Sequence, residues 1–267
     1  MAKKRHRTKQ WLSKKPRARP KAASAPKFDR PFIEEMTPDA VRGLVFDDNA
    51  RVQREFIRRW SPEIDRALAS ISAAHAGLKT YRGAVAANLR NAEVEAFLHS
   101  AHYSLIAALH HLVSGYPVAA GHMQRHYLES VAMTALCIDA QSGVFEAWHK
   151  DKGHYPVHQA PTKLRQKKVR KRLEALIAFN PSGWESILKM ARDFESRSHA
   201  SGLTLAYQTL FEEENMVVLG GEFDPAKEVA YRADLRRIAG AAKLLEKLAA
   251  AAATVLRKMP GEEEGPE

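Results

Sequence analysis

The sequence predicts an all-α protein, an up-and-down bundle of about seven to nine helices with a disordered basic N-terminal arm. Three observations lead to this prediction. Capping residues followed directly by proline, which are typical of helix starts, recur at Thr37, Ser61 and Asp224. Apolar residues along 94–112 alternate in steps of four and three, the spacing of one helix face. Strand character is confined to 215–223, and one short strand does not make a sheet.

The first elements are expected to be short or medium helices. Their predicted ranges are 37–46, 49–60, 61–77 and 81–89. Asn91 then caps a long helix whose apolar stripe is Val94, Leu98, Ala101, Leu105, Ala108 and Leu112. Gly115 ends this helix and Pro117 opens the next one, so only a tight turn separates them. The two long helices should therefore lie antiparallel and side by side.

Beyond residue 141 the helical pattern loosens. We expect one or two helical turns and a surface loop over 143–162, followed by helices at 163–179 and 184–200. Asp224 and Pro225 then start a final long helix, which Pro260 stops. The alanines of this last helix allow neighbouring helices to approach closely, as they do inside a bundle.

The positive charge of the chain is concentrated at its N-terminus. The net charge is +11, and residues 1–30 hold 12 Lys or Arg against one acid, which leaves 30 bases and 30 acids elsewhere. So polar a segment buries too little apolar surface to offset the entropy of ordering it. We therefore predict a disordered basic arm over 1–32, a single helical-bundle domain over 33–258 and an acidic disordered tail over 259–267.

A flexible cationic arm can neutralise phosphates, and an aromatic ring within it can stack on a base. Such binding is sensitive to salt and largely blind to sequence, so the expected partner is nucleic acid or another polyanion. The predicted contacts are the basic residues of the arm and its tryptophan: Lys3, Lys4, Arg5, Arg7, Trp11, Lys14, Lys15, Arg17 and Arg19. The alternative is a solvated arm that aids solubility or makes incidental polyanion contacts.

The rest of the composition restricts the compartment. Cys137 is the one cysteine of the sequence, which excludes a disulfide framework and fits a reducing cytoplasm. No apolar stretch is long enough to serve as a signal peptide or to span a bilayer. We expect a soluble cytoplasmic protein with no membrane partner, and no cofactor is predicted.

Polar residues form a stripe on the helix that opens at Pro117. Arg125, His126 and Glu129 fall within about 60° of His122 on a helical projection. Because the chain turns back near residue 115, positions whose numbers sum to about 231 are level, which puts His102 beside Glu129.

We predict a polar seam of His102, Arg125, His126 and Glu129, with the arginine and the glutamate paired. Two histidines and a glutamate can also hold zinc, and bundle interiors host metal sites. A metal-dependent enzyme that uses His122 together with His102, His126 and Glu129 is therefore an alternative.

A second candidate site lies in the stretch "MARDFESRSHA", residues 190–200. Arg192 and His199 are two helical turns apart on one side of the predicted helix. Arginine can hold a phosphate and histidine can act as a general acid or base, while the RNA 2′-hydroxyl supplies the nucleophile. The same residues could equally be part of a satisfied ion-pair network with Glu195 and Arg197.

Two likenesses rest on these residues. "LVSGYPVAAGHMQRHYLESVAMTALCIDA" resembles the core of a bacterial family of uncharacterised all-helical proteins, in which a small-residue turn precedes a helix with Arg and, four residues later, Glu. A later helix of that family contains Ser and His, here "ESRSHAS", and the likeness covers about residues 90–210. The resemblance implies that Arg125, Glu129 and His199 surround a shared polar spot.

The spacing of Arg192 and His199 is also similar to that of HEPN-type helical ribonucleases, which act as dimers in toxin and phage-defence systems. The resemblance implies a homodimeric, metal-independent endoribonuclease in which Arg192 positions phosphate and His199 handles the proton. Asp193 is an acceptable polar residue after the arginine, but the chain is longer than the usual compact domain.

Three functions follow in order of preference. The first is a non-enzymatic module that associates with nucleic acid or a ribonucleoprotein through the arm, helped by the basic face at 167–172. The HEPN-like ribonuclease and the metal-dependent bundle enzyme are the second and the third.

The ribonuclease hypothesis predicts that induced expression of the wild-type chain slows the growth of its host and that His199→Ala relieves this effect. The substitution removes the group that moves the proton and leaves the predicted helix intact. Growth curves of the two strains at matched protein levels measure the difference. Equal growth would exclude this hypothesis.

Overall fold

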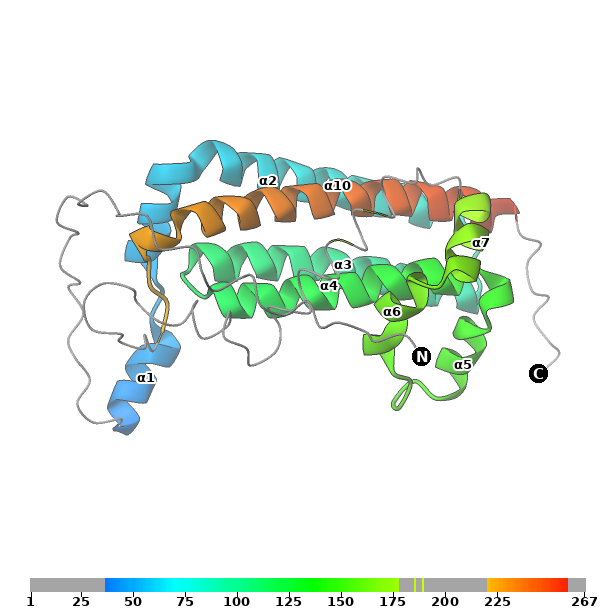
Figure 1. The fold of residues 1–267 in the computed structure, drawn as a ribbon, viewed down its shortest axis with the longest axis horizontal. Coiled ribbons are helices and arrows are strands. Elements are labelled where there is room, and N and C mark those ends of the chain that lie inside the picture. Colours follow the sequence, from blue (N-terminus) through cyan, green and yellow to red (C-terminus); the bar gives the residue numbers. More distant parts are fainter. Residues whose placement is uncertain (1–36, 178–184, 186–188, 190–219, 259–267) are drawn as a thin grey trace, which may run out of the picture. The chain divides into compact units, whose positions relative to one another are not determined.

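The computed structural model describes residues 37–177, 185, 189 and 220–258; the predicted arm and acidic tail, 1–32 and 259–267, lie outside these ranges. Regular elements in the described ranges are all α-helices or short 3-10 helices, which confirms the all-α prediction. Four long helices form the bundle (Figure 1): α2 (Ala50–Ala84), α3 (Leu89–Val113), α4 (Pro117–Ile138) and α10 (Glu228–Lys258).

The other elements are shorter. They are α1 (Pro38–Phe46), η1 (Ala140–Ser142), α5 (Val144–Lys150), η2 (Val157–Gln159), α6 (Ala160–Leu164), α7 (Lys167–Ile177) and η3 (Pro225–Lys227). The one or two helical turns expected after residue 143 are present as α5, and residues 151–156 that follow contain no helix, as expected of a loop; η2 and α6 were not predicted. None of the helices in the described ranges combines the length and apolar composition needed to cross a membrane.

The bundle is built from two helix pairs. The helix α10 packs along α2, and α3 packs along α4 as predicted from the tight turn between them (Figure 1). The predicted stripe of α3 forms part of the core, since Val94, Leu98, Ala101, Leu105, Ala108 and Leu112 are fully buried. Alanines of α10 such as Ala242 and Ala249 are also fully buried, which allows the close approach expected of this helix.

Two helix starts agree with the predicted caps. The Thr37 hydroxyl accepts a hydrogen bond from the Ala40 amide at 3.2 Å at the start of α1, and the Asp224 carboxylate caps η3 by accepting from the Ala226 amide at 2.9 Å. The helix α1 buries none of its residues and exposes Phe46. At the start of α2, Asn49 adopts a left-handed conformation with φ of 52°.

The segment 49–89 agrees with the prediction only in part. Two helical segments meet inside α2 at a kink at Trp60, whose φ and ψ of −139° and 32° are not helical, so the boundary predicted directly before Ser61 and Pro62 is present. Gly77, in contrast, does not end the second segment. A Cβ there would lie 3.5 Å from the Glu246 Cα, an ordinary van der Waals distance, so this position faces α10 without requiring a glycine.

The predicted helix at 81–89 is therefore the end of α2 and the beginning of α3. The N-cap of α3 is Asn88, which accepts a hydrogen bond from the Asn91 amide at 2.8 Å, and not Asn91 itself. The Asn91 side chain instead donates to the Ala86 carbonyl at 2.7 Å and closes the α2–α3 turn.

Residues 221–224 pack against the turn between α3 and α4. The Glu222 amide donates to the Gly115 carbonyl at 3.2 Å. Gly115 has φ of +82°, and a Cβ on it would lie 2.4 Å from the Glu222 nitrogen. The Arg51 guanidinium donates to both carboxylate oxygens of Glu222, at 2.7 and 2.8 Å, which fixes the same segment to α2.

The start of α10 is held by an aromatic cluster. Phe56 and Trp60 of α2 contact Phe223 and Tyr231, with ring centroids 5.0 to 6.0 Å apart. The Arg59 guanidinium lies 4.8 Å from the Phe223 ring centroid, a cation–π contact. The kink at Trp60 thus coincides with the point at which α2 meets the beginning of α10.

We expect Gly115→Ala to lower the free energy of unfolding by more than about 2 kcal/mol, because both its left-handed φ and the nearby Glu222 backbone resist a side chain. Urea unfolding followed by circular dichroism measures the loss. Gly143→Ala is the matched control, since Gly143 has φ of +64° but no atom within 4 Å of the added Cβ. It should cost about 1 kcal/mol. Equal losses would contradict a role for the contact with Glu222.

Candidate nucleic-acid interface

The paired centre of the predicted seam is present. Arg125 donates through Nε to Glu129 Oε1 at 2.9 Å, one helical turn further along α4. The two side chains are 30% and 15% exposed, so the pair is partly screened from water. This agrees with the four-residue spacing from which the pair was predicted.

His126 is oriented by serines that link α3 to α4. Its Nδ1 lies 2.7 Å from the Ser104 hydroxyl, which donates its own hydrogen to the Ser100 carbonyl. Nδ1 of His126 is therefore the donor in this contact. The Ser100 and Ser130 hydroxyls lie 3.0 Å apart and form a second polar link between the helices. The residue numbers of the Ser104–His126 pair and of the Ser100–Ser130 pair each sum to 230. The register predicted from the tight turn gave a sum of about 231, so it is correct to within one residue.

His102 does not join the seam. Its Nε2 lies 3.1 Å from the Ile71 carbonyl of α2, and its ring centroid is 5.3 Å from that of His75. The reason is rotation about α3: two residues turn the helix by about 200°, so a neighbour of Ser104 at this spacing points away from α4. The expected contact with Glu129 was wrong because level positions were taken to face each other.

The metal alternative has no site in the described residues. In these ranges no three His, Cys, Asp or Glu side chains come together in a group that could hold a metal ion. His122 and His126 are exposed on α4, while His102 faces α2. The other candidates, Arg192 and His199, lie outside the described residues, as do the predicted contacts of the arm.

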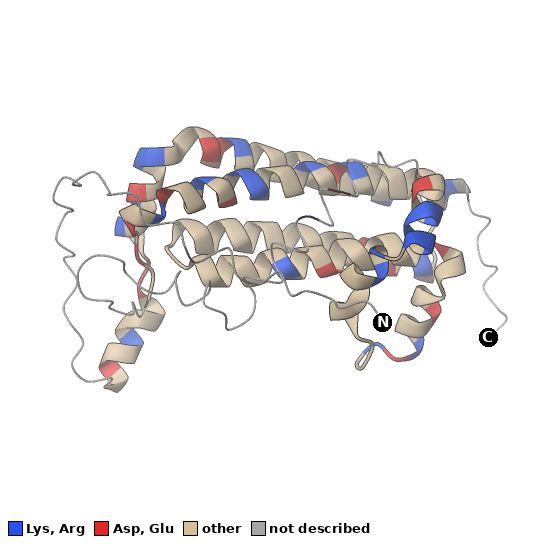
Figure 2. Cartoon of the chain, viewed as in Figure 1, with Lys and Arg blue, Asp and Glu red and all other residues tan. Residues whose placement is uncertain are grey.

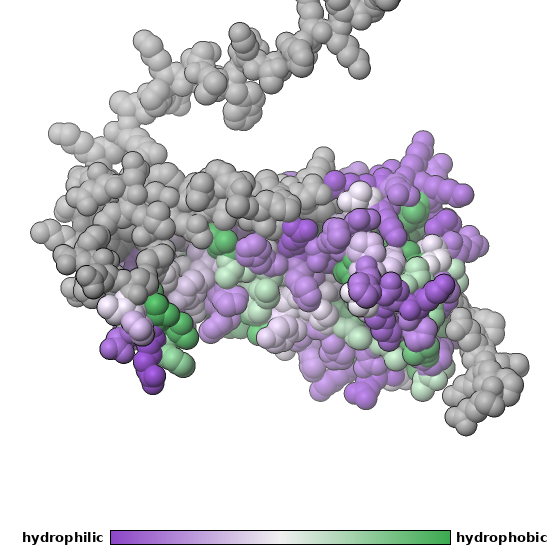
Figure 3. Space-filling view, turned by 90° about the horizontal axis from the view of Figure 1, so that it is seen from below, coloured by the Kyte–Doolittle hydropathy of each residue, from purple (hydrophilic) through white to green (hydrophobic). Residues whose placement is uncertain are grey.

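The described residues that best fit a polyanion lie at one end of the bundle. Residues 140–177 contain nine Lys or Arg and three acids, a balance of +6. Figure 2 shows basic residues gathered on α7, and the space-filling view shows a strongly hydrophilic surface at the same end (Figure 3). Lys167, Lys168 and Lys171 of α7 are exposed, and no carboxylate in the described ranges pairs with them. We call α5, η2, α6 and α7 the basic end.

Three ion pairs fix the basic end to the long helices. Arg172 of α7 donates to the buried carboxylate of Asp139 at 2.8 to 2.9 Å. Arg90 of α3 pairs with Glu146 of α5 at 2.7 Å. Lys152 pairs with Glu93 of α3.

Glu93 also accepts a hydrogen bond from Trp148 Nε1 at 3.1 Å. Burial raises the pKa of Glu93, but the hydrogen bonds from Lys152 and Trp148 outweigh it, so this pKa is lowered overall. Glu93 therefore carries a stable negative charge under the basic end.

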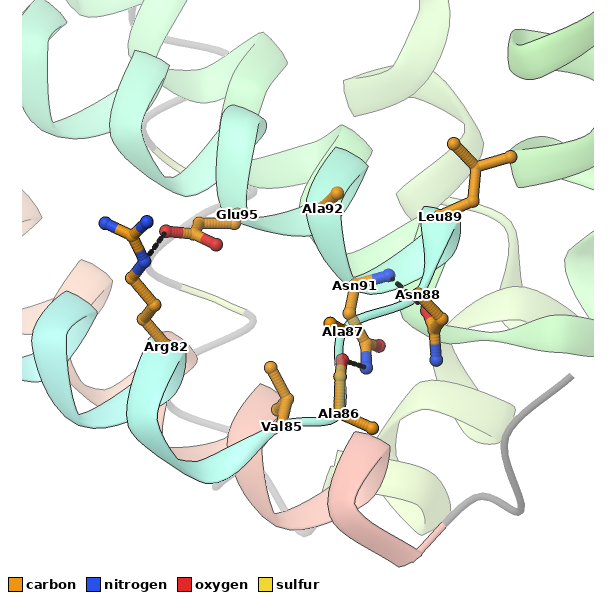
Figure 4. Close-up of a pocket in the computed structure, with 9 residues that line it drawn as sticks. All are labelled: Arg82, Val85, Ala86, Ala87, Asn88, Leu89, Asn91, Ala92 and Glu95. Atoms are coloured by element: carbon orange, nitrogen blue, oxygen red, sulfur yellow. Dashed lines mark hydrogen bonds and ion pairs between the residues drawn. The ribbon is translucent and has the colours of Figure 1, made fainter. Parts of the chain in front are cut away.

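An open groove lies at the α2–α3 turn. Its volume is about 570 Å³, and Figure 4 shows the Arg82–Glu95 ion pair on one side and Asn88 and Asn91 on the other. The polar groups of these side chains pair with one another or with the backbone, so the groove presents little unpaired charge. The sequence did not indicate this groove, because it predicted Asn91 and not Asn88 as the helix cap.

Comparisons with known proteins add no assignment. No family model, curated protein or solved structure matches the chain.

The half-buried His102 makes the stability depend on pH. Burial lowers the pKa of His102 from 6.5, the charges of His75 and His99 add to this, and the hydrogen bond to the Ile71 carbonyl opposes it. Below about pH 6.5 the unfolded chain binds more protons at this site than the folded chain does, so stability should fall as the pH falls.

We expect the free energy of unfolding of the wild type to fall more steeply between pH 7 and pH 5 than that of His102→Gln. Glutamine does not titrate and can still donate to the Ile71 carbonyl. Urea unfolding at a series of pH values gives the two slopes. His111, whose pKa is also lowered by burial and by His110, contributes equally to both chains. Parallel slopes would show that His102 does not contribute.

Proposed function

We propose that this chain is a helical-bundle module that binds nucleic acid through the arm, residues 1–32, and the basic end. The observation that carries the proposal is the exposed cationic face of α7. Lys167, Lys168 and Lys171 lie within an arc of about 100° on that helix, so all three can reach one phosphate backbone.

The basic end is suited to hold such a face in place. The acidic Asp139 and Glu93 engage Arg172 and Lys152, which leaves the lysines of α7 to face solvent. Binding a phosphate is more favourable in free energy for a cation without a carboxylate partner than for a cation whose ion pair must first be broken. The anchors therefore separate the cations that support the fold from those that can bind a ligand.

Cations of the arm and cations of α7 are expected to contribute differently. If the arm is disordered, as its composition predicts, its cations raise the association rate and follow the backbone of any nucleic acid. Cations on a helix have fixed spacing and hold the bound strand against one surface of the bundle. Their combination supports salt-sensitive binding with little dependence on sequence.

Replacing Lys167, Lys168 and Lys171 by glutamine should weaken nucleic-acid binding and reduce its salt dependence. Each phosphate contact contributes about 0.7 to 0.9 to the slope of log affinity against log salt, so the slope should fall by about 2. Fluorescence anisotropy with a labelled RNA over a salt series measures both quantities.

The matched control replaces Lys79, Lys243 and Lys247, exposed lysines of α2 and α10, and changes the net charge equally. It should keep the wild-type slope. Equal effects of the two lysine sets would contradict a defined face on α7.

Deletion of residues 1–30 should abolish most of the affinity for nucleic acid. Unchanged affinity after this deletion would contradict binding by the arm. Binding to anionic lipid vesicles without binding to RNA or DNA would overturn the proposal.

A further inference from the structure

A stack of planar groups lies beside the cations of the basic end. The Arg90 guanidinium is 4.3 Å from the ring centroid of Phe145, and the His149 imidazole stacks on the same phenyl ring at 5.9 Å with an interplanar angle of 13°. Phe145 is 5% exposed and Arg90 is 6% exposed, whereas His149 is exposed. The stack thus begins in the protein interior and ends in solvent.

The position of the imidazole ring is set by the fold. Phe145 and His149 are one helical turn apart on α5, so the helix itself brings the two rings together. Arg90 donates to the Cys137 carbonyl at 3.0 Å and to Glu146 at 2.7 Å, which holds the guanidinium under Phe145. The Phe145 ring lies nearly parallel to the imidazole and offset from it, and His149 is exposed, so the imidazole is accessible to a ligand.

Cations flank this ring. Lys150 is exposed on the same helix, and Lys152 follows two residues later in the turn after α5. The acids nearby are Glu93, which pairs with Lys152, and Glu146, which pairs with Arg90. Each acid is therefore already engaged with a base.

We infer that the basic end takes a single strand of nucleic acid, with a base stacked on His149 and the adjoining phosphates near Lys150. This inference rests on the proposed function and specifies its ligand. In a duplex, neighbouring bases cover one another's faces, so an exposed ring has no partner there. In a single strand a base can leave its neighbours and stack on a protein ring among cations.

The test compares two single strands of equal length and charge, oligothymidine and an abasic oligonucleotide with the same sugar-phosphate backbone. The full-length wild type should bind oligothymidine about tenfold more tightly, which corresponds to one stacked base. His149→Ala should remove this difference and leave binding to the abasic strand unchanged. His149→Phe should retain the preference, because stacking needs a ring and not the imidazole charge.

Two control variants locate the stacking. His154→Ala removes an exposed histidine from the neighbouring turn and should keep the wild-type preference. Trp11→Ala tests the one tryptophan of the arm. If Trp11→Ala abolishes the preference and His149→Ala does not, stacking belongs to the arm and the inference is overturned. Equal wild-type affinity for both strands also overturns it, but leaves the proposed function intact. Failure to bind either strand contradicts both.

Discussion

The bundle depends on the contact between residues 221–224 and the α3–α4 turn. Gly115 brings its backbone against that of Glu222, and Arg51 binds the Glu222 carboxylate from α2. One short segment therefore touches both helix pairs at the point where α10 begins. From this start α10 follows α2 for its whole length and packs on α3 and α4. Its position completes the core, since Tyr127 of α4 donates across the bundle to the Ala241 carbonyl at 2.7 Å.

Local signals in the sequence predicted the structure correctly where a residue interacts with its neighbours along the chain. Thr37 and Asp224 cap the expected helices, and the apolar stripe of α3 is buried as its spacing predicts. The boundary predicted before Ser61 and Pro62 is present as the kink at Trp60, where two helical segments of α2 meet beside the aromatic cluster. Prediction from the sequence failed where the conformation depends on a residue far away along the chain. Gly77 resembles a helix stop, but it lies inside α2 at a position that faces Glu246 of α10.

The candidate sites show the same division. The Arg125–Glu129 pair follows from spacing along a single helix, and the structure contains it. Placing His102 beside Glu129 required the rotation of α3 as well as its register, and the tight turn defines only the register. The sequence indicated part of the basic end, the basic run 167–172. It did not indicate how far the basic end extends, because Asp139 and Glu93 lie 33 and 59 residues from the bases with which they pair.

Arg90 connects the fold of the basic end to its proposed binding surface. A buried guanidinium is costly unless its donors are used, and this one donates to a carbonyl in the last turn of α4 and to Glu146. Its remaining planar face lies against Phe145, which in turn supports His149. The side chain that satisfies the end of α4 therefore also supports the phenyl ring on which His149 packs. A ring that already packs on the protein before a ligand arrives loses less conformational entropy on binding, which favours stacking of a base.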